Sequence, residues 1–430
     1  MIISKRLLLK LIRTILFIAL YYSLGCISSS HFGNIDNWIN MSFDTIPDQE
    51  DYPEAGAVIL LDEAQLEVFQ RNGKPFSTVD RHTVVKILNE RGYSFANVVI
   101  PYEAGTKISR IQARTRLPDG RIVSLLTDQV FDTNLYSDYV YYSDTRAKRF
   151  AMPAVEVGCV VEYRWRKTVN HFDIWTYWPF QREEPVLLSR YTVTSPRELG
   201  IRHKTYGNQI HSELRTTSLG DKIQRVWEAN DVPAFIPEIS APPGNEAIGH
   251  IKFSPLGVND WEDIATWFRD LAEDRMKPNE QVKTTTRRLI QGLNSPEEIL
   301  RRIFEYVRDN VRYVPIEIGI GGYQPHHAAT VLRNNFGDCK DMTTLIIAMA
   351  DAAGIEVHPV LISTWPNGKA DSSLVSQAHF NHVIALSMQK DGSEIWMDAT
   401  EKKCPFGELP WYDQNRFVLV VFKKDGYPGR

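Results

Sequence analysis

Hydrophobic and polar positions alternate in short runs through most of the first half of the chain. The runs are rich in β-branched and aromatic residues, as in STVDRHTVVKIL (77–88) and GCVVEYRWRKTV (158–169). Turn sequences such as LPDG (117–120) separate them. Alternation with a period of two is typical of strands that are buried on one face. The pattern therefore predicts an antiparallel, sandwich-like β domain over residues 56–235.

Helical periodicity begins after a connector rich in proline and glycine, which we place at residues 236–258. Asp260 can cap a first helix, and SPEE (295–298) is a capping box that opens a second helix. A third helix is predicted to start at Cys339. Three strand-like runs follow it: VHPVLIST (357–364), FNHVIALSM (380–388) and EIWMDAT (394–400). Helices followed by an antiparallel sheet predict an α+β domain over residues 259–412.

The N-terminal residues have a different pattern from both domains. Four basic residues come before an apolar stretch of about ten residues: Lys5, Arg6, Lys10 and Arg13. Such a stretch is too short to span a hydrocarbon core of ~30 Å, and it suits the apolar region of a secretory signal. We therefore expect residues 1–26 to direct export to the cell envelope.

The end of this segment resembles a bacterial lipoprotein cleavage box. Gly25-Cys26 matches the box, whereas Ser23 stands where an aliphatic residue is usual. We expect Cys26 to carry lipid and to hold the protein at the membrane, with the polar residues 27–55 as a tether. Plain cleavage and a retained signal anchor are the alternatives.

Composition narrows the possible functions. The chain has 430 residues, 24% of them charged, and a formal net charge of −4. No basic field exists to attract nucleic acid, so no nucleic-acid partner is expected. His326 and His327 with Cys339 could suggest zinc, but no CxxC or HExxH spacing occurs, so no metal is expected. No cofactor is expected either.

Four cysteines are too few for a disulfide scaffold in a chain of this length. Cys159 follows a glycine in an apolar strand and is expected in the core, while Cys404 is expected at the surface or paired with Cys159. If Cys26 carries lipid, an odd number of cysteines remains, so at least one thiol is free. Cys339 is a candidate for this free thiol.

Cys339 stands at the start of a helix, in the sequence GDCKD (337–341). Unpaired backbone N–H groups and the helix dipole favour a thiolate there, and Lys340 adds a cation. Asp338 and Asp341 act in the opposite direction. Position alone leaves both a buried structural thiol and a nucleophile open.

A nucleophilic thiol needs a base, and the base needs an orienting partner. His382 and Asp398 lie on consecutive predicted strands. A two-residue turn between the strands would put them on opposite faces of the sheet. A three-residue loop over 390–392, with Gly392 in the left-handed conformation, pairs Ile384 with Asp398 and leaves His382 diagonal to it. His379 has the wrong parity for that face. The geometry thus permits a Cys-His-Asp triad without requiring one.

Three motifs together resemble the bacterial transglutaminase-like domain, a papain-related thiol fold. GDCKD (337–341), NHV (381–383) and W-x-D-x-T (396–400) stand in the family's order of cysteine on a helix, histidine on a strand and aspartate on the next strand. This match covers about 260–410. Upstream sequences such as FAMPAVEVGCVVEYRWR resemble the uncharacterised β domain that commonly precedes it in exported bacterial proteins, over about 50–235.

The resemblance implies a role for each matched residue. Cys339 would be the nucleophile, His382 its base and acid, and Asp398 the group that orients the imidazole. The oxyanion donors would be the backbone N–H of Cys339 and one upstream side chain, with Gln324 and Tyr313 as the candidates.

The implied reaction is acyl transfer from an amide of a protein or peptide substrate, through a thioester. Water as the acceptor makes a peptidase or amidase, which we prefer, and an amine makes a protein cross-linking transglutaminase. A non-catalytic envelope module that uses the thiol fold as a scaffold is the alternative from another class. Relatives usually continue into a further β-rich region, so residues 413–430 are expected to begin such a region, in a truncated or naturally short form.

Overall fold

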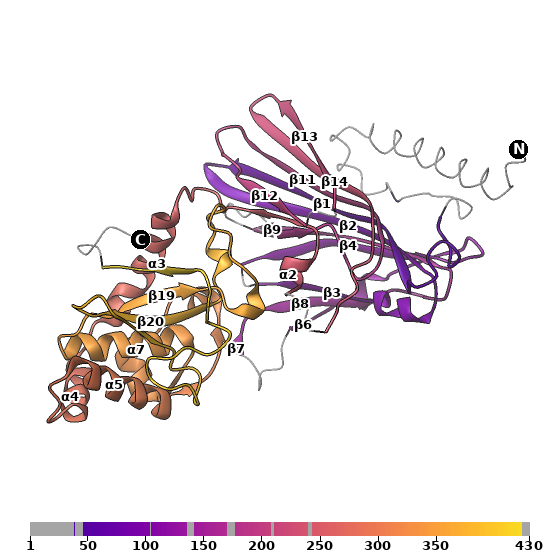
Figure 1. The fold of residues 1–430 in the computed structure, drawn as a ribbon. Coiled ribbons are helices and arrows are strands. Elements are labelled where there is room, and N and C mark those ends of the chain that lie inside the picture. Colours follow the sequence, from indigo (N-terminus) through magenta and orange to yellow (C-terminus); the bar gives the residue numbers. More distant parts are fainter. Residues whose placement is uncertain are drawn as a thin grey trace, which may run out of the picture.

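The computed structural model describes the following residues: 38, 46–103, 105–135, 142–169, 177–207, 210–239 and 243–423. The predicted export segment and Cys26 lie outside them. The chain forms a large β-rich unit followed by an α+β unit (Figure 1), as predicted for the fold class. No helix among the described residues is long and apolar enough to cross a membrane.

An eight-stranded sheet dominates the N-terminal unit, in the order β13-β14-β11-β1-β2-β9-β4-β5. Its strands are β1 (Ala57–Arg71), β2 (Lys74–Ile87), β4 (Lys107–Arg116), β5 (Ile122–Ser124), β9 (Val160–Val169), β11 (Val186–Pro196), β13 (Ser212–Leu219) and β14 (Lys222–Val232). Neighbours in this sheet are antiparallel except for β1 and β11, which pair in parallel. The sheet is therefore antiparallel as predicted, apart from this one pair of strands.

Two three-stranded sheets complete this unit. One consists of β3 (Asn97–Tyr102), β8 (Arg146–Ala151) and β6 (Phe131–Asn134), and the other of β10 (Tyr177–Pro179), β15 (His250–Phe253) and β12 (His203–Tyr206). β15 corrects the predicted linker over 236–258, because its residues join the N-terminal unit as the central strand of a sheet. The linker also contains the short helix α2 (Gly244–Ala247).

The core of the N-terminal unit is aromatic. Trp178, Tyr191 and Trp227 are buried together, and the rings of Trp178 and Tyr191 stack with centroids 5.1 Å apart. Phe253 packs edge-on against Tyr191, with centroids 5.4 Å apart. Large aromatic side chains bury more apolar surface than other residues do, so they contribute strongly to the stability of this unit.

The C-terminal unit packs helices against a four-stranded antiparallel sheet. The helices are α3 (Trp261–Ala272), α4 (Glu280–Leu289), α5 (Pro296–Asn310), α6 (Ala328–Asn334) and α7 (Cys339–Ala352). The sheet has the order β21 (Glu394–Met397), β20 (His382–Met388), β19 (His358–Ile362) and β22 (Val418–Val420). α7 lies centrally and contacts α4, α5, α6 and β20, which explains why it is apolar on most sides.

β22 falls in the segment that was expected to begin a further β-rich region. It pairs with β19 instead and completes the sheet of the α+β unit. Two short parallel pairs occur nearby: β16 (Arg312–Tyr313) with β18 (Phe336–Gly337), and β17 (Ile316–Glu317) with β7 (Tyr142–Ser143). The second pair joins the two units.

Polar contacts also connect the units. The ammonium of Lys204 on β12 lies 2.5 Å from a carboxylate oxygen of Asp371. The hydroxyl of Tyr206 donates to the same oxygen at 2.8 Å. These contacts attach the loop before β20 to the N-terminal unit, so both units contribute to holding the segment that leads to His382.

Candidate active site

The start of α7 is built by a reciprocal cap. Asp338 is the N-cap residue, and its carboxylate accepts a hydrogen bond from the backbone N–H of Asp341 at 3.3 Å. The carboxylate of Asp341 accepts in turn from the backbone N–H of Asp338 at 3.3 Å. Cys339 is therefore the first residue of the helix, half-buried, where unpaired N–H groups favour a thiolate.

Gly337 is required by the close approach of this cap. A Cβ atom at position 337 would lie 2.6 Å from the Cβ of Asp341. Any larger residue would push Asp341 away from its cap position. The glycine of the GDCKD motif thus allows the helix to begin at Cys339.

The basic side chains near this cap are already paired with its two carboxylates. The ammonium of Lys340 is buried and forms an ion pair with Asp338, so it is not directed at the thiol as its sequence position suggested. Asp341 accepts hydrogen bonds from the backbone N–H of His326 at 2.7 Å and from its Nδ1 at 3.0 Å. Burial and the neighbouring Asp341 raise the pKa of Asp338.

The β20–β21 hairpin has the predicted register. Ala385 pairs with Met397, which puts Ile384 opposite Asp398. The backbone N–H of Gln389 donates to Ser393 O at 2.8 Å around a three-residue loop, in which Gly392 has φ 86°. The predicted left-handed glycine and its loop are confirmed.

This register brings His382 and Asp398 together. The distance between His382 Nε2 and Asp398 Oδ2 is 3.1 Å, and both side chains are buried. An ionised carboxylate can only accept, so Nε2 carries the proton of this hydrogen bond. Nδ1 of His382 is then the ring nitrogen available to the thiol of Cys339.

The charges around His382 stabilise its protonated imidazole. Burial opposes the charge of His382, but hydrogen bonds to Asp398 and Cys339 outweigh it and raise the pKa of His382 well above its usual value. Burial likewise opposes ionisation of Asp398, and the contact with His382 keeps the pKa of Asp398 lowered. Asp398 also accepts from the backbone N–H and the hydroxyl of Thr400, at 2.9 and 2.7 Å. The arrangement can hold an imidazolium beside a thiolate.

The two candidate oxyanion side chains are placed differently. The amide of Gln324 donates to Leu271 O and accepts from Arg275, each at 3.2 Å, so both of its ends are engaged by the segment formed by α3 and the turn after it. Tyr313 lies on β16 directly across from Gly337, two residues before Cys339. Of the two, Tyr313 has the better position, and its role stays a prediction.

Asp413 is a second carboxyl beside His382, and no motif in the sequence points to it. Its Oδ2 lies 4.0 Å from His382 Nε2, and its side chain is fully buried. His382, Asp398 and Asp413 each offer one ligand atom, and these atoms lie within 4.8 Å of one another, close enough to share a cation or a proton. His382 and Asp398 form a hydrogen bond with each other. We therefore interpret the three side chains as a group that shares protons.

The other two described cysteines are free and buried. The prediction that Cys404 is at the surface or paired with Cys159 is wrong, because its thiol is buried and contacts Glu408 O at 3.3 Å. Burial raises the pKa of Cys159, and it raises the pKa of Cys404 to about 11. Neither thiol has the surroundings of a nucleophile.

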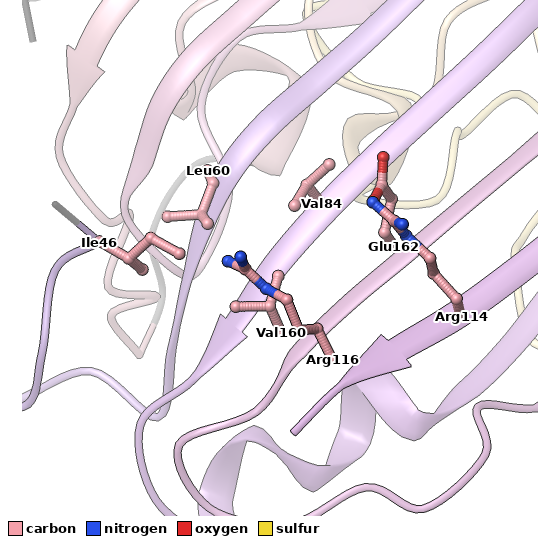
Figure 2. A pocket seen from close by; sticks show the side chains of 7 residues that line it. All are labelled: Ile46, Leu60, Val84, Arg114, Arg116, Val160 and Glu162. Atoms are coloured by element: carbon pink, nitrogen blue, oxygen red, sulfur yellow. The ribbon is translucent and has the colours of Figure 1, made fainter. Parts of the chain in front are cut away.

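Two hollows are lined by residues other than Cys339, His382 and Asp398. The larger, of about 270 Å³, lies between the units and is lined by these residues: Tyr177, Lys252, Phe253, Leu374, Ser376, Ala378 and His379. The smaller lies on the large sheet, where the side chain of Arg116 lies beside Val160 and that of Arg114 beside Glu162 (Figure 2). Its volume of about 10 Å³ is room for no more than one water molecule.

Comparison with known proteins identifies both units. A domain of unknown function with a solved structure, DUF3857, matches residues 77–236, and the core of the transglutaminase-like superfamily matches residues 283–399. No curated protein matches the chain.

Two solved structures were compared with the fold. The crystal structure of a candidate protease from Parabacteroides distasonis aligns with a TM-score of 0.68 and 15% identity, over 85% of this chain and 70% of that one. At that identity the likeness extends to the fold alone. A candidate cysteine protease from Cytophaga hutchinsonii covers 78% of this chain and 79% of its own at 10% identity, but its TM-score of 0.23 supports no argument.

Proposed function

Since this chain carries a transglutaminase-like superfamily core behind a DUF3857 domain, we propose that it is a cysteine enzyme that cleaves amide bonds through a thioester. The observation that supports this most is the buried contact between His382 and Asp398, 3.1 Å long, next to a thiol at a helix N-terminus. Metal and cofactor chemistry are not needed for this reaction.

The steps follow from the placement of the groups. The thiolate of Cys339 attacks the amide carbonyl, and the backbone N–H of Cys339 donates to the oxyanion that forms. His382 gives its proton to the leaving nitrogen as the C–N bond breaks, which leaves a thioester. Water then attacks the thioester and passes a proton to His382, so the products are an amine and an acid, and the thiol is regenerated. Asp398 keeps the imidazole oriented and stabilises its charge.

The acceptor distinguishes a hydrolase from a cross-linking enzyme. A primary amine that attacks the thioester in place of water would give a new amide. Of the two reactions, we favour hydrolysis of a protein or peptide substrate. Incubating the protein with a peptide library, with and without an alkylamine, tests this choice. Mass spectrometry should find cleaved peptides in both samples, whereas amine-bearing products would point to a transglutaminase.

An electrophilic thiol probe should label Cys339 at neutral pH at least ten times faster than it labels Cys159 or Cys404. The reason is the helix N-terminus and the imidazole at Cys339, against the raised pKa of the two buried thiols. Peptide mapping after short exposure measures the three rates. The unfolded chain is the control, in which the rates should become similar. Similar rates in the folded protein would favour the non-catalytic envelope module.

We also propose that the protein is exported and held at the membrane by lipid on Cys26. A basic segment, a short apolar stretch and Gly25-Cys26 support this location. Mass spectrometry of the mature N-terminus should find a lipid-modified Cys26, and Cys26→Ser should release the protein or stall its processing. An intact Met1 would contradict cleavage, and an unmodified start beyond Cys26 would contradict the lipid anchor.

A further inference from the structure

Asp413 is a buried carboxyl beside the pair of His382 and Asp398. Its residue is only 2% exposed, and neither carboxylate oxygen accepts a hydrogen bond from an N–H or hydroxyl group of the described residues. Asp398, in contrast, has Thr400 and His382 as donors. A buried carboxylate that lacks donors is costly, so its presence beside a catalytic pair calls for an explanation.

The loop around Asp413 keeps this carboxyl in place. The backbone N–H of Asp413 donates to Pro410 O at 2.9 Å, and that of Trp365 donates to Tyr412 O at 2.7 Å. The guanidinium of Arg416 donates to Ser363 O at 2.7 Å. The segment after β21 is thereby tied to the loop after β19, and Asp413 points inward toward His382.

Asp413 lies where its carboxylate can act as a second counter-ion of a protonated His382. Nε2 of His382 lies 3.1 Å from Asp398 and 4.0 Å from Asp413. One N–H can make only one good hydrogen bond, and Asp398 takes it. An ionised Asp413 therefore acts on the imidazolium by charge, at a distance where a carboxylate raises the pKa of its partner by about 1–3 units.

The charge of Asp413 changes near neutral pH. Burial, together with Asp398, raises the pKa of Asp413 to about 7, although His382 opposes this shift. Below that pH, Asp413 holds a proton, which it can donate to Asp398. Above it, two negative charges adjoin the imidazole instead of one, so His382 keeps its proton to higher pH.

We propose that Asp413 is a positioning residue whose carboxyl adds a second negative charge beside His382 and extends the imidazolium–thiolate pair toward alkaline pH. The inference rests on the proposed function, because it assigns a role within the same site. Asp413 touches neither the thiol nor the substrate in this role and acts through His382.

The other ionisable groups near Asp413 do not take over its role beside His382. His382 of β20 and Asp398 act on Asp413, and Cys339 of α7 acts on His382. In the segment after β21, Cys404 and Tyr412 respond to Asp398 and Asp413, and also to Glu401 and, for Cys404, Glu408. Burial raises the pKa of Cys404 to about 11, and it raises the pKa of Tyr412 further still, so both are neutral at pH 7. Asp398 is ionised there, because its pKa is lowered.

The test compares two alkylating agents on the whole protein, iodoacetate and iodoacetamide. Iodoacetate is an anion, so the ratio of its rate constant at Cys339 to that of neutral iodoacetamide reports the charge around the thiol. In the wild type this ratio should fall in two steps, near pH 7 as Asp413 ionises and again as His382 loses its proton. Asp413→Asn should lack the first step and should bring the second to lower pH by about one unit.

A matched carboxyl change provides the control. Asp391→Asn, at the exposed tip of the β20–β21 hairpin, should leave both steps in place. Thermal unfolding should confirm that Asp413→Asn is folded. Identical pH profiles for wild type and Asp413→Asn would overturn the inference, as would loss of Cys339 alkylation at every pH in a folded variant.

A second measurement separates this inference from the proposed function. Proton NMR can titrate the imidazole of His382, with its signal assigned through His382→Gln. The pKa of His382 should be about one unit lower in Asp413→Asn than in the wild type. If Cys339 shows no preferential labelling, the proposed function fails, while this titration still decides the role of Asp413, and an unchanged titration would overturn it.

Discussion

Replacing Cys339 with alanine should lower amide turnover by about six orders of magnitude. The substitution removes the atom that forms the thioester in the proposed mechanism. No other described thiol can take its place, because Cys159 and Cys404 are buried and their thiol pKa values are raised. Turnover of a fluorogenic peptide found in the library screen measures the loss. The helix cap does not involve the thiol, so the thermal midpoint should change little.

The double variant Cys339→Ala, His382→Ala makes this prediction sharper. Groups that act as one unit are strongly non-additive, so the double variant should be no slower than Cys339→Ala alone. A further large loss in the double variant would mean that His382 acts on the substrate independently of the thiol. Substantial turnover by Cys339→Ala would remove the thioester from the mechanism.

The geometry of the hairpin could be predicted from local rules. A period of two along each strand and a glycine that tolerates positive φ leave few registers for residues 382–398, and the three-residue loop is the one that puts His382 and Asp398 on the same face. The structure has that register. The start of α7 at Cys339 was predictable for a similar reason, since Asp338 is a good N-cap.

Asp413 illustrates what local rules miss. It stands in the turn-rich segment after β21, where no periodicity assigns it a face. Its approach to His382 depends on backbone contacts between two loops that are far apart in sequence. The parallel pairing of β1 with β11 and the recruitment of β15 from the predicted linker also depend on tertiary contacts. The pattern of a single sequence indicates which residues are buried and whether a segment is a helix or a strand. It does not indicate which distant segment packs against the buried residues.

The role expected for Lys340 failed for a related reason. The position of Lys340 next to Cys339 suggested a cation for the thiol, yet the buried ammonium of Lys340 pairs with Asp338. A buried lysine needs an acidic partner more than an exposed one does, because desolvation of an unpaired charge is costly. In the proposed mechanism, the helix N-terminus and His382, rather than Lys340, would stabilise a thiolate at Cys339.

Replacing Asp398 with asparagine should lower turnover by about four orders of magnitude while the fold is retained. The amide can still contact Thr400, but its NH₂ group can donate to Nε2 of His382 and so stabilise the tautomer that directs an N–H at the thiol. The imidazolium also loses the carboxylate charge that helps to raise the pKa of His382. Steady-state turnover of the fluorogenic peptide, compared with circular dichroism, measures both parts of the prediction.

Asp351→Asn is the matched control for this change. Asp351 is an exposed carboxyl near the C-terminal end of α7, where it pairs with Lys423, so its loss should cost little. Turnover within threefold of wild type in Asp398→Asn would show that Asp398 is structural. Among the described residues, Asp413 would then be the one carboxylate left beside His382 in that variant, and Asp413→Asn would be expected to cause the loss predicted for Asp398→Asn.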